Sequence, residues 1–109
     1  MDYKQPRSQP ESKAAKRLCN YMEARGWGVW KVGAGKYVSG WPDYYAFHPQ
    51  HGHRWIETKA PGGKLRGSQI KRFRSMTKAG DSIFVLEDEK TYARLFQPAN
   101  WELYIRGVL

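Results

Sequence analysis

The spacing of hydrophobic residues changes several times along the chain. Near the N-terminus, apolar residues recur at the three- and four-residue intervals of one helix face, at Ala15, Leu18 and Met22. We therefore predict a helix over residues 10–25, ending before Gly26. Glu11 lies four, seven and eleven residues before those apolar positions, which places its carboxylate on the same stripe at the start of the helix.

Four shorter segments have the composition of β-strands. They are rich in aromatic and β-branched residues, and they cover residues 27–33, 43–48, 53–59 and 82–87. The second and third flank the turn signal PQHG, so we expect them to pair as an antiparallel hairpin. The fourth, SIFVLE, is a continuous apolar run, which is typical of a strand buried on both faces.

A second helix is predicted over residues 69–79, with Ser68 as its N-cap and Gly80 after its end. Because this helix crosses between strands 53–59 and 82–87, those two strands should be parallel. The order helix, strand, strand, strand, helix, strand predicts a single α/β or α+β domain.

The last part of the chain has a less regular pattern. Residues 89–96 are expected to form a short helix. In WELYIRG, residues 101–107, apolar and polar residues alternate, which indicates an edge strand that could pair across the symmetry axis of a dimer. The alternative is that this tail packs on the domain's own core.

The charge of the chain points to a polyanionic partner. Among 109 residues, 19 Lys and Arg stand against 10 Asp and Glu, for a net charge of +9. Nucleic acid is the first candidate, although a ribosomal or capsid-like protein would have a similar charge. The single cysteine excludes an internal disulfide and a zinc cluster built on cysteines. No apolar run reaches the ~18 residues of a membrane span, and residues 1–9 form a polar tail without a signal core, so we expect a cytoplasmic protein.

Two carboxylates and a lysine stand out in the predicted hairpin. Glu57 and Lys59 are two residues apart on a strand, so their side chains point to the same face. Asp43 should lie opposite residue 57 or 58, depending on the register. Two carboxylates ~5 Å apart repel each other unless a cation lies between them. Mg²⁺ or Mn²⁺ suits such ligands, and Lys59 could orient the water that attacks a phosphodiester.

The alternative is that Asp43 and Glu57 are ordinary hairpin residues paired with Lys59, since Glu-x-Lys is a common sequence. The surrounding charge favours a phosphodiesterase site. Between residues 54 and 78, Glu57 is the single acidic residue, and there are eight positive residues: Arg54, Lys59, Lys64, Arg66, Lys71, Arg72, Arg74 and Lys78. A basic rim around an acidic centre suits a substrate with a phosphate backbone.

In this arrangement the chain resembles the VRR-NUC family of small phage and bacterial nucleases, within the P-D-(D/E)-x-K superfamily. The matching residues follow the order of the family: Glu11, Lys31, GWPD (40–43), IETK (56–59), APGGKL (60–65), Gln69 and AGDSIFVL (79–86). The resemblance covers roughly residues 10–88. Two features depart from it, since Trp41 stands where a smaller residue is usual and residues 97–109 have no counterpart.

The resemblance implies a fold and a catalytic set. The fold is a restriction-endonuclease-like mixed sheet of about four strands flanked by helices. The catalytic residues that it implies are Asp43, Glu57, Lys59, Gln69 and Glu11. Asp43 and Glu57 would ligate Mg²⁺ or Mn²⁺ together with the Thr58 carbonyl, and Lys59 would assist the nucleophilic water. Small members of the family are similar to Holliday-junction resolvases and act as homodimers on branched DNA.

We therefore predict a metal-dependent DNA endonuclease, with a nuclease domain over residues 10–96 and a candidate dimerisation segment over residues 97–109. Candidate contacts to the DNA backbone are Lys64, Arg66, Lys71, Arg72 and Arg74. Tyr37 and Trp41, in the loop before the site, are candidates for base stacking. The alternatives are a sequence-specific restriction- or homing-type nuclease, a general nuclease on the same fold, and a basic DNA-binding protein without chemistry.

Overall fold

The computed structural model describes residues 13–33 and 39–107 of the chain. Its elements, in chain order, are α1 (Lys13–Glu23), β1 (Gly28–Lys31), β2 (Tyr44–His48), β3 (Gly52–Thr58), α2 (Gly67–Lys78), β4 (Ile83–Leu86), the 3-10 helix η2 (Glu89–Phe96) and α3 (Trp101–Ile105). The order of helices and strands up to β4 is the predicted one, and the short helix expected over residues 89–96 is also present. None of the described helices is long and apolar enough to cross a membrane.

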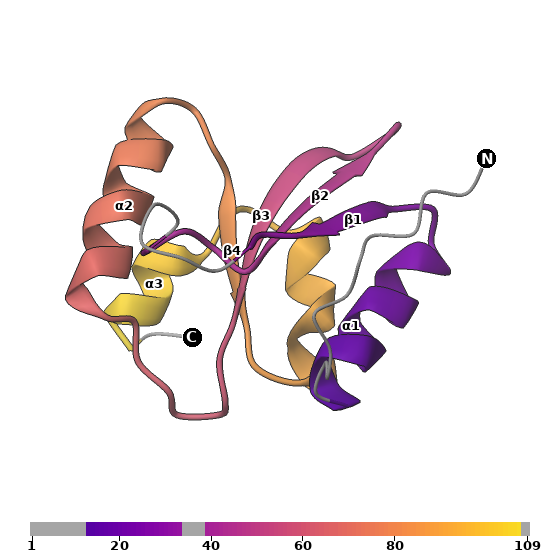
Figure 1. Ribbon diagram of the computed structural model, residues 1–109, viewed down its shortest axis with the longest axis horizontal. Helices are drawn as coiled ribbons and strands as arrows, with labels where there is room; N and C mark the ends of the chain where they lie inside the picture. Colours follow the sequence, from indigo (N-terminus) through magenta and orange to yellow (C-terminus); the bar gives the residue numbers. More distant parts are fainter. Residues whose placement is uncertain (1–12, 34–38, 108–109) are drawn as a thin grey trace.

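The four strands form one mixed sheet in the order β1-β2-β3-β4. β1, β2 and β3 are antiparallel neighbours, and β4 lies parallel to β3, as the crossover through α2 requires. The predicted hairpin and the predicted parallel pair are therefore both confirmed. All four residues of β4 are buried, because helices flank this strand on both sides (Figure 1).

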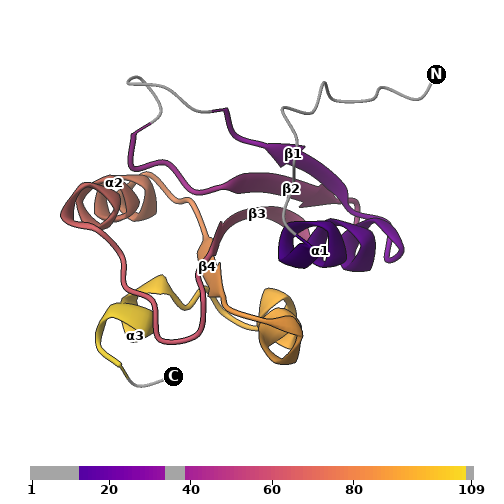
Figure 2. The ribbon, with the colours of Figure 1, turned by 60° about the horizontal axis from the view of Figure 1, so that its bottom comes forward.

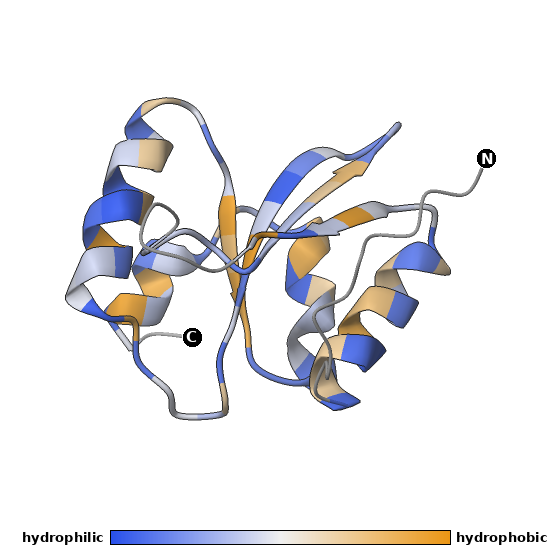
Figure 3. Ribbon diagram, viewed as in Figure 1, coloured by the Kyte–Doolittle hydropathy of each residue, from blue (hydrophilic) through white to orange (hydrophobic). Residues whose placement is uncertain are grey.

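The helices form two layers, one on each side of the sheet (Figures 1 and 2). The core beneath α1 and η2 includes Leu18, Met22, Tyr44, Ala46, Ile56 and Leu95. The core beneath α2 and α3 includes Phe73, Met76, Ile83, Val85 and Trp101. Figure 3 shows the apolar residues of β4 between these two layers. Alternate residues of β4 thus serve two separate cores, which explains its continuous apolar sequence.

α2 begins earlier than the sequence predicts. Its N-cap is Arg66, and Ser68 lies in the first turn, where it is exposed. The reason is Gln69, whose side-chain oxygen accepts a hydrogen bond from the Arg66 N–H at 2.9 Å. This amide supplies the capping contact that the sequence assigns to Ser68. At the other helix, the predicted start at residues 10–12 lies outside the described residues.

The edge strand predicted for residues 101–107 is wrong. Residues there form α3, in which Trp101 is buried whereas Leu103 and Ile105 are exposed. Trp101 packs in the core beneath α2, and its indole N–H donates to Thr77 Oγ1 at 2.8 Å. In α3 the Trp101 indole is buried and its N–H is hydrogen-bonded at the same time. The tail therefore packs on the core of the domain, and residues 101–107 offer no strand for pairing across a dimer axis.

Candidate active site

The carboxylates of Asp43 and Glu57 meet where β2 begins and β3 ends. In the hairpin, Tyr44 pairs with Ile56, so the next step of the register places Asp43 opposite Glu57. The sequence left residues 57 and 58 as alternatives, and the structure selects residue 57. Asp43 also contacts Thr58, whose backbone N–H and hydroxyl donate to Asp43 Oδ2 at 2.9 and 2.7 Å. The end of the hairpin therefore brings the two predicted metal ligands face to face.

The short segment before Asp43 packs closely on the start of α2. Gly40 has a φ of +82°, and a Cβ at this position would lie 2.7 Å from the Ser68 carbonyl oxygen. Only glycine can bring the chain this close in this conformation. Pro42 is buried, and the Asp43 carbonyl accepts a hydrogen bond from the Val32 N–H at 2.8 Å. These contacts fix the position from which the Asp43 carboxylate projects.

Glu57 is a buried acidic residue, with only 3% of its surface exposed. Its Oε2 accepts a hydrogen bond from Gln69 Nε2 at 2.8 Å and lies 3.3 Å from Lys59 Nζ. Its Oε1 is buried without a hydrogen-bond partner among the described residues. A buried oxygen of this kind costs free energy in the folded state unless another group binds it.

Gln69 connects the charged residues to the start of α2. Its Oε1 accepts hydrogen bonds from Lys59 Nζ at 3.1 Å and from the Arg66 N–H at 2.9 Å, while its Nε2 donates to Glu57. These three bonds fix the orientation of the amide, because its oxygen faces two donors and its nitrogen faces a carboxylate. The fold therefore brings Glu57, Lys59 and Gln69 together as the sequence predicts.

Burial raises the pKa of Glu57 from 4.5 to about 7, and repulsion from Asp43 acts in the same direction. Lys59 and Gln69 lower this pKa, but they do not offset the effect of burial. Near neutral pH, Glu57 is therefore divided between its charged and neutral forms. A cation between Glu57 and Asp43 would favour the charged form of both.

The oxygens at this site suit a hard divalent cation. Mg²⁺ is commonly held by one or two carboxylates and several waters, and Asp43 and Glu57 provide the carboxylates. Within residues 13–33 and 39–107, no group of three or more acidic, histidine or cysteine side chains could hold a metal ion. Glu11, the predicted supporting carboxylate, lies outside the described residues. The metal-binding role of the Thr58 carbonyl stays a prediction.

Two residues that the sequence analysis missed hold the loop over residues 60–66, between β3 and α2. The Glu87 carboxylate accepts a hydrogen bond from the Gly62 N–H at 3.0 Å, and the Tyr104 hydroxyl donates to the Gly63 carbonyl. Burial and then the charge of Glu87 raise the pKa of Tyr104, so its hydroxyl keeps the proton that it donates. The parallel pairing of β3 with β4 could have indicated Glu87, whereas Tyr104 gave no signal because α3 was not predicted.

An open cleft of about 640 Å³ lies beside the end of β3. Its lining includes Thr58, Lys59 and Glu87, together with Leu18 of α1 and Tyr92 of η2. The Lys59 side chain is 17% exposed. The Lys59 side chain is thus partly accessible to solvent, whereas Glu57 beside it is buried.

The predicted DNA contacts lie on the loop and on α2. Four of them are exposed: Lys64, Arg66, Lys71 and Arg74. Arg72 is partly buried, with its guanidinium carbon 5.0 Å from the centre of the Trp41 ring. Tyr37 lies outside the described residues. Because no acidic residue occurs between residues 58 and 80, the segment that contains this loop and α2 is strongly positive.

Comparison with known proteins bears on the fold. No family model matches the chain, and no curated protein matches it significantly. A search of solved structures finds a VRR_NUC domain with a TM-score of 0.68 and 25% sequence identity, covering 78% of this chain and 91% of the other. The likeness spans nearly all of that domain, and it points to a nuclease. The chain therefore has a VRR-NUC-like, restriction-endonuclease-like fold.

Proposed function

We propose that this chain is a divalent-metal-dependent DNA endonuclease. The observation that carries the proposal is the buried Glu57 carboxyl, which faces Asp43 and keeps one oxygen without a hydrogen-bond partner in the described chain. Buried polar atoms usually have at least one hydrogen-bond partner, so an unpaired carboxylate oxygen that faces a second carboxylate favours a bound cation. The likeness to a VRR_NUC domain supports a nuclease as the class of enzyme.

Asp43 and Glu57 would hold Mg²⁺ or Mn²⁺, with the Thr58 carbonyl as a further ligand and Glu11 in support. The ion would activate water and neutralise charge on the phosphoryl oxygens. The chain's own contribution is to orient the two carboxylates in advance. Thr58 binds Asp43 through two hydrogen bonds, and Gln69 binds Glu57 through one. Little reorganisation is then needed at the moment of reaction.

Lys59 is placed to act on the attacking water or on the phosphate. Its Nζ lies between Glu57 Oε2, at 3.3 Å, and Gln69 Oε1, at 3.1 Å. An ammonium group has three donors, so one N–H is left for a water or a phosphoryl oxygen. In the proposed reaction, water attacks phosphorus in line and loses a proton, and the bond from phosphorus to the O3′ oxygen breaks. The O3′ oxygen takes up a proton from solvent, so the products are a 5′-phosphate and a 3′-hydroxyl. Lys59 stabilises the negative charge that develops on the phosphoryl group.

The positive side of the domain would bind the DNA backbone. The five candidate contacts are Lys64, Arg66, Lys71, Arg72 and Arg74. Replacing two of them should weaken binding to all DNA sequences alike and lower the salt dependence by roughly one unit of slope for each lost phosphate contact. A changed base preference with an unaltered salt dependence would show instead that these side chains contact bases.

Branched DNA, such as a Holliday junction, is the substrate in this proposal, and a homodimer is the active form. One domain carries one set of Asp43, Glu57 and Lys59, so it cuts one strand at a time. Resolving a four-way junction needs two symmetric cuts, and a two-fold dimer presents two such sites. Because residues 101–107 form α3 (Trp101–Ile105) and a turn, the dimer would be built by other means than strand pairing of that segment.

The deciding experiment measures cleavage of matched linear, nicked, flapped and four-way DNA by the purified chain, with Mg²⁺, with Mn²⁺ or with excess chelator. We expect metal-dependent cuts, a preference for the four-way junction and a dimer mass in light scattering. A monomer that cuts linear and branched DNA equally would refute the preference for branched DNA and indicate a general nuclease. Binding without cleavage in either metal would refute the proposal and leave a basic DNA-binding protein.

A further inference from the structure

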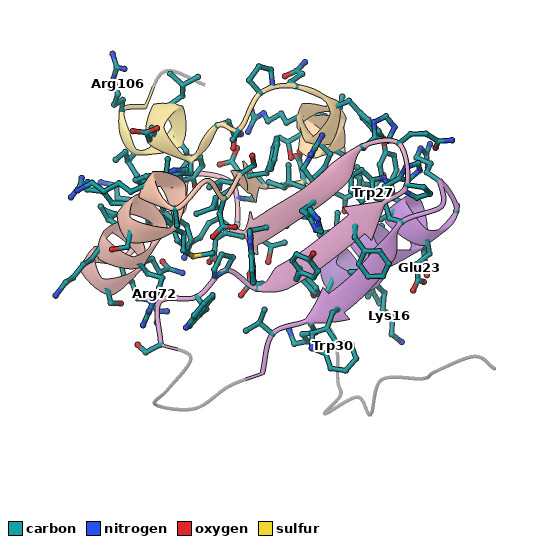
Figure 4. The ribbon with its side chains drawn as sticks, turned by 90° about the horizontal axis from the view of Figure 1, so that it is seen from above. Lys16, Glu23, Trp27, Trp30, Arg72 and Arg106 are labelled. Carbon is teal, nitrogen blue, oxygen red and sulfur yellow. The ribbon has the colours of Figure 1, made fainter. Side chains whose placement is uncertain are left out.

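One face of the sheet is covered by helices only in part. Tyr44 and Ala46 of β2 are buried in the core beneath α1, so Tyr45 and Phe47 point to the opposite face. α2 lies beside that face at β4 and leaves β1 and the hairpin open (Figures 2 and 4). Phe47 is 51% exposed there, and Trp30, the cross-strand partner of Tyr45, is 44% exposed. This face therefore presents large aromatic side chains to solvent.

Five aromatic side chains form a connected group on this face, in which Trp41 contacts Trp55, and Tyr45 contacts Trp55, Phe47 and His53. This aromatic strip consists of Trp41, Trp55, Tyr45, Phe47 and His53. Trp41 and Trp55 are partly buried against the core beneath α2. Neighbouring ring centroids along it lie 5.0 to 6.1 Å apart. The Tyr45 hydroxyl is also hydrogen-bonded to His53 Nδ1, which ties the two strands of the hairpin together on this face.

A cleft of about 700 Å³ opens beside the strip, next to the turn that precedes β4. Its lining includes Tyr45, His53 and Trp55 from the strip and Asp81 and Ser82 from the turn. The rings offer apolar surface, and the carboxylate and hydroxyl can hydrogen-bond the polar edge of a base. The cleft thus combines the two kinds of contact by which an unpaired base is held.

The strip begins next to the proposed active site. Tyr45 follows Asp43 by two residues and Trp55 precedes Glu57 by two residues, so all four side chains lie on the same face. About 7 Å of strand separates each ring from the nearer carboxylate. Successive stacked nucleotides are ~3.4 Å apart. If a DNA strand has one phosphate at Asp43, its bases near Tyr45 therefore lie about two nucleotides from the cut.

The border of the strip has the charge that a nucleic acid requires. The strip itself contains no Lys, Arg, Asp or Glu. At its α2 end, the Arg72 guanidinium carbon lies 5.0 Å from the centre of the Trp41 ring, and Lys71 and Arg74 are exposed elsewhere on the same helix. A DNA strand supplies neutral bases for the rings and phosphates for these cations. A second copy of the chain fits less well, since it brings 19 Lys and Arg against 10 Asp and Glu.

We infer that the aromatic strip binds unpaired bases of the DNA strand beside the cut. The inference rests on the proposed nuclease function and adds the structural feature of DNA that the domain recognises. Paired bases keep their faces inside the stack of a duplex, so only a flap, a frayed end or a branch point can offer them to the strip. The strip therefore favours DNA with unpaired nucleotides over a continuous duplex.

The test measures binding without cleavage. The full chain is titrated in excess chelator with a short single-stranded thymidine oligonucleotide and with an abasic oligonucleotide of equal length. The two probes have the same phosphates, so a difference in affinity reports the bases. We expect the thymidine probe to bind at least about tenfold more tightly and to quench tryptophan fluorescence, because its bases can stack on the aromatic rings and the abasic probe has none.

Variants of Phe47 locate the effect. Phe47→Ala should lower the affinity for the thymidine probe about tenfold and leave both the abasic affinity and the salt dependence unchanged. Phe47→Leu keeps the apolar bulk that supports the fold but removes the aromatic ring. It should therefore show most of the same loss of affinity for the thymidine probe. Phe96→Ala is the matched control, because Phe96 is similarly exposed, at 44%, but lies on η2, on the other side of the sheet.

The outcomes separate the strip from the proposed enzyme. Equal affinity for the two probes, or Phe47 variants that bind both as the native chain does, would overturn the inference. A native dimer that Phe47→Ala converts to a monomer with unaltered DNA affinity would show that the face binds a second copy, and would also overturn it. A chain that prefers the thymidine probe but cuts no DNA with Mg²⁺ or Mn²⁺ would support the strip and refute the nuclease.

Discussion

Two buried polar side chains flank the same part of the sheet and differ in how fully they are hydrogen-bonded. Asn100, 4% exposed, accepts a hydrogen bond from the Val85 N–H at 2.7 Å and donates to the Val85 carbonyl at 3.1 Å. Glu57, 3% exposed, is the residue that β3 places beside Val85. One of its oxygens has no partner in the part of the chain that the structure describes.

The difference between the two residues follows from their positions. β4 forms one edge of the sheet, so its outer backbone groups need partners, and the Asn100 amide takes the place of a further strand. Glu57 instead faces Asp43, which opposes its charge, and burial keeps water from its second oxygen. These two residues therefore differ in hydrogen bonding and not in burial. The Trp27 indole N–H and one Arg94 N–H are also buried without a partner in the described chain, so what sets Glu57 apart is an unpaired carboxylate oxygen facing a second carboxylate.

The largest expected difference between Glu57 and Asn100 is in activity. Glu57→Gln keeps the size of the side chain and removes its charge, so we expect cleavage to fall roughly 10²–10³-fold or more. Asn100→Ala should keep the native rate for each folded molecule, since the side-chain hydrogen bonds of Asn100 join it to the Val85 backbone and not to the proposed active site. Single-turnover rates in Mg²⁺, with the folded fraction measured by circular dichroism, test both expectations. A native rate in Glu57→Gln would contradict the metal-nuclease proposal.

The second difference is in stability. Asn100→Ala leaves the Val85 N–H and carbonyl buried without partners, so the free energy of unfolding should fall by roughly 2–4 kcal/mol. Gln97→Ala removes an exposed amide nearby and serves as the control, with an expected change within about 0.5 kcal/mol. Urea denaturation measures both. Equal stability of the two variants would show that the bonds between Asn100 and Val85 contribute little.

The third difference is in the response to pH. Because the pKa of Glu57 is raised from 4.5 to about 7, the folded chain keeps a proton between these pH values that the unfolded chain has lost. The stability of the native chain in chelator should therefore fall as the pH rises from 4.5 to 7, and the penalty should be complete above 7. Glu57→Gln should be more stable than the native chain at pH 8, by roughly 1–3 kcal/mol, and should lose this advantage below pH 4.5.

Divalent cations provide the control for this pH effect. Mg²⁺ or Mn²⁺ should stabilise the native chain at pH 8 and have little effect on Glu57→Gln, because only the native carboxylate gains a partner. Cation affinity should also rise with pH through about 7, as Glu57 loses its proton. Thermal melting with and without the cation measures this. A native chain that Mg²⁺ and Mn²⁺ leave unchanged would argue against a cation at Glu57.

The smallest expected effect concerns the loop over residues 60–66. Tyr104→Phe removes the hydrogen bond to the Gly63 carbonyl, worth roughly 0.5–1.5 kcal/mol, and should loosen the chain between Lys59 and α2. We expect cleavage to fall about two- to tenfold with unchanged affinity for DNA. Leu103→Ala, an exposed neighbour on α3, is the control. A fall in DNA affinity instead would place Tyr104 in the binding surface.

Local pattern predicted most of the sheet. The hairpin followed from two β-rich segments around PQHG, and the parallel pairing of β3 with β4 followed from the helix between them. Both predictions depend on chain connectivity and on the period of the strand, which nearby residues determine. Where distant residues compete, the local pattern was wrong. The alternation in WELYIRG indicated a strand, but burial of the Trp101 indole against α2 favours a helix.

The sequence by itself determined which chemical groups this domain has and which of them share a face. The period of a strand places Glu57 and Lys59 on one side, and composition gives the basic surroundings of the pair. The tertiary structure decided how those groups behave. The pKa of Glu57 is raised because the fold buries its carboxyl group and brings it near the charge of Asp43, which is distant in the chain. A pKa and an unpaired oxygen depend on every atom nearby in space, and only the complete fold brings those atoms together.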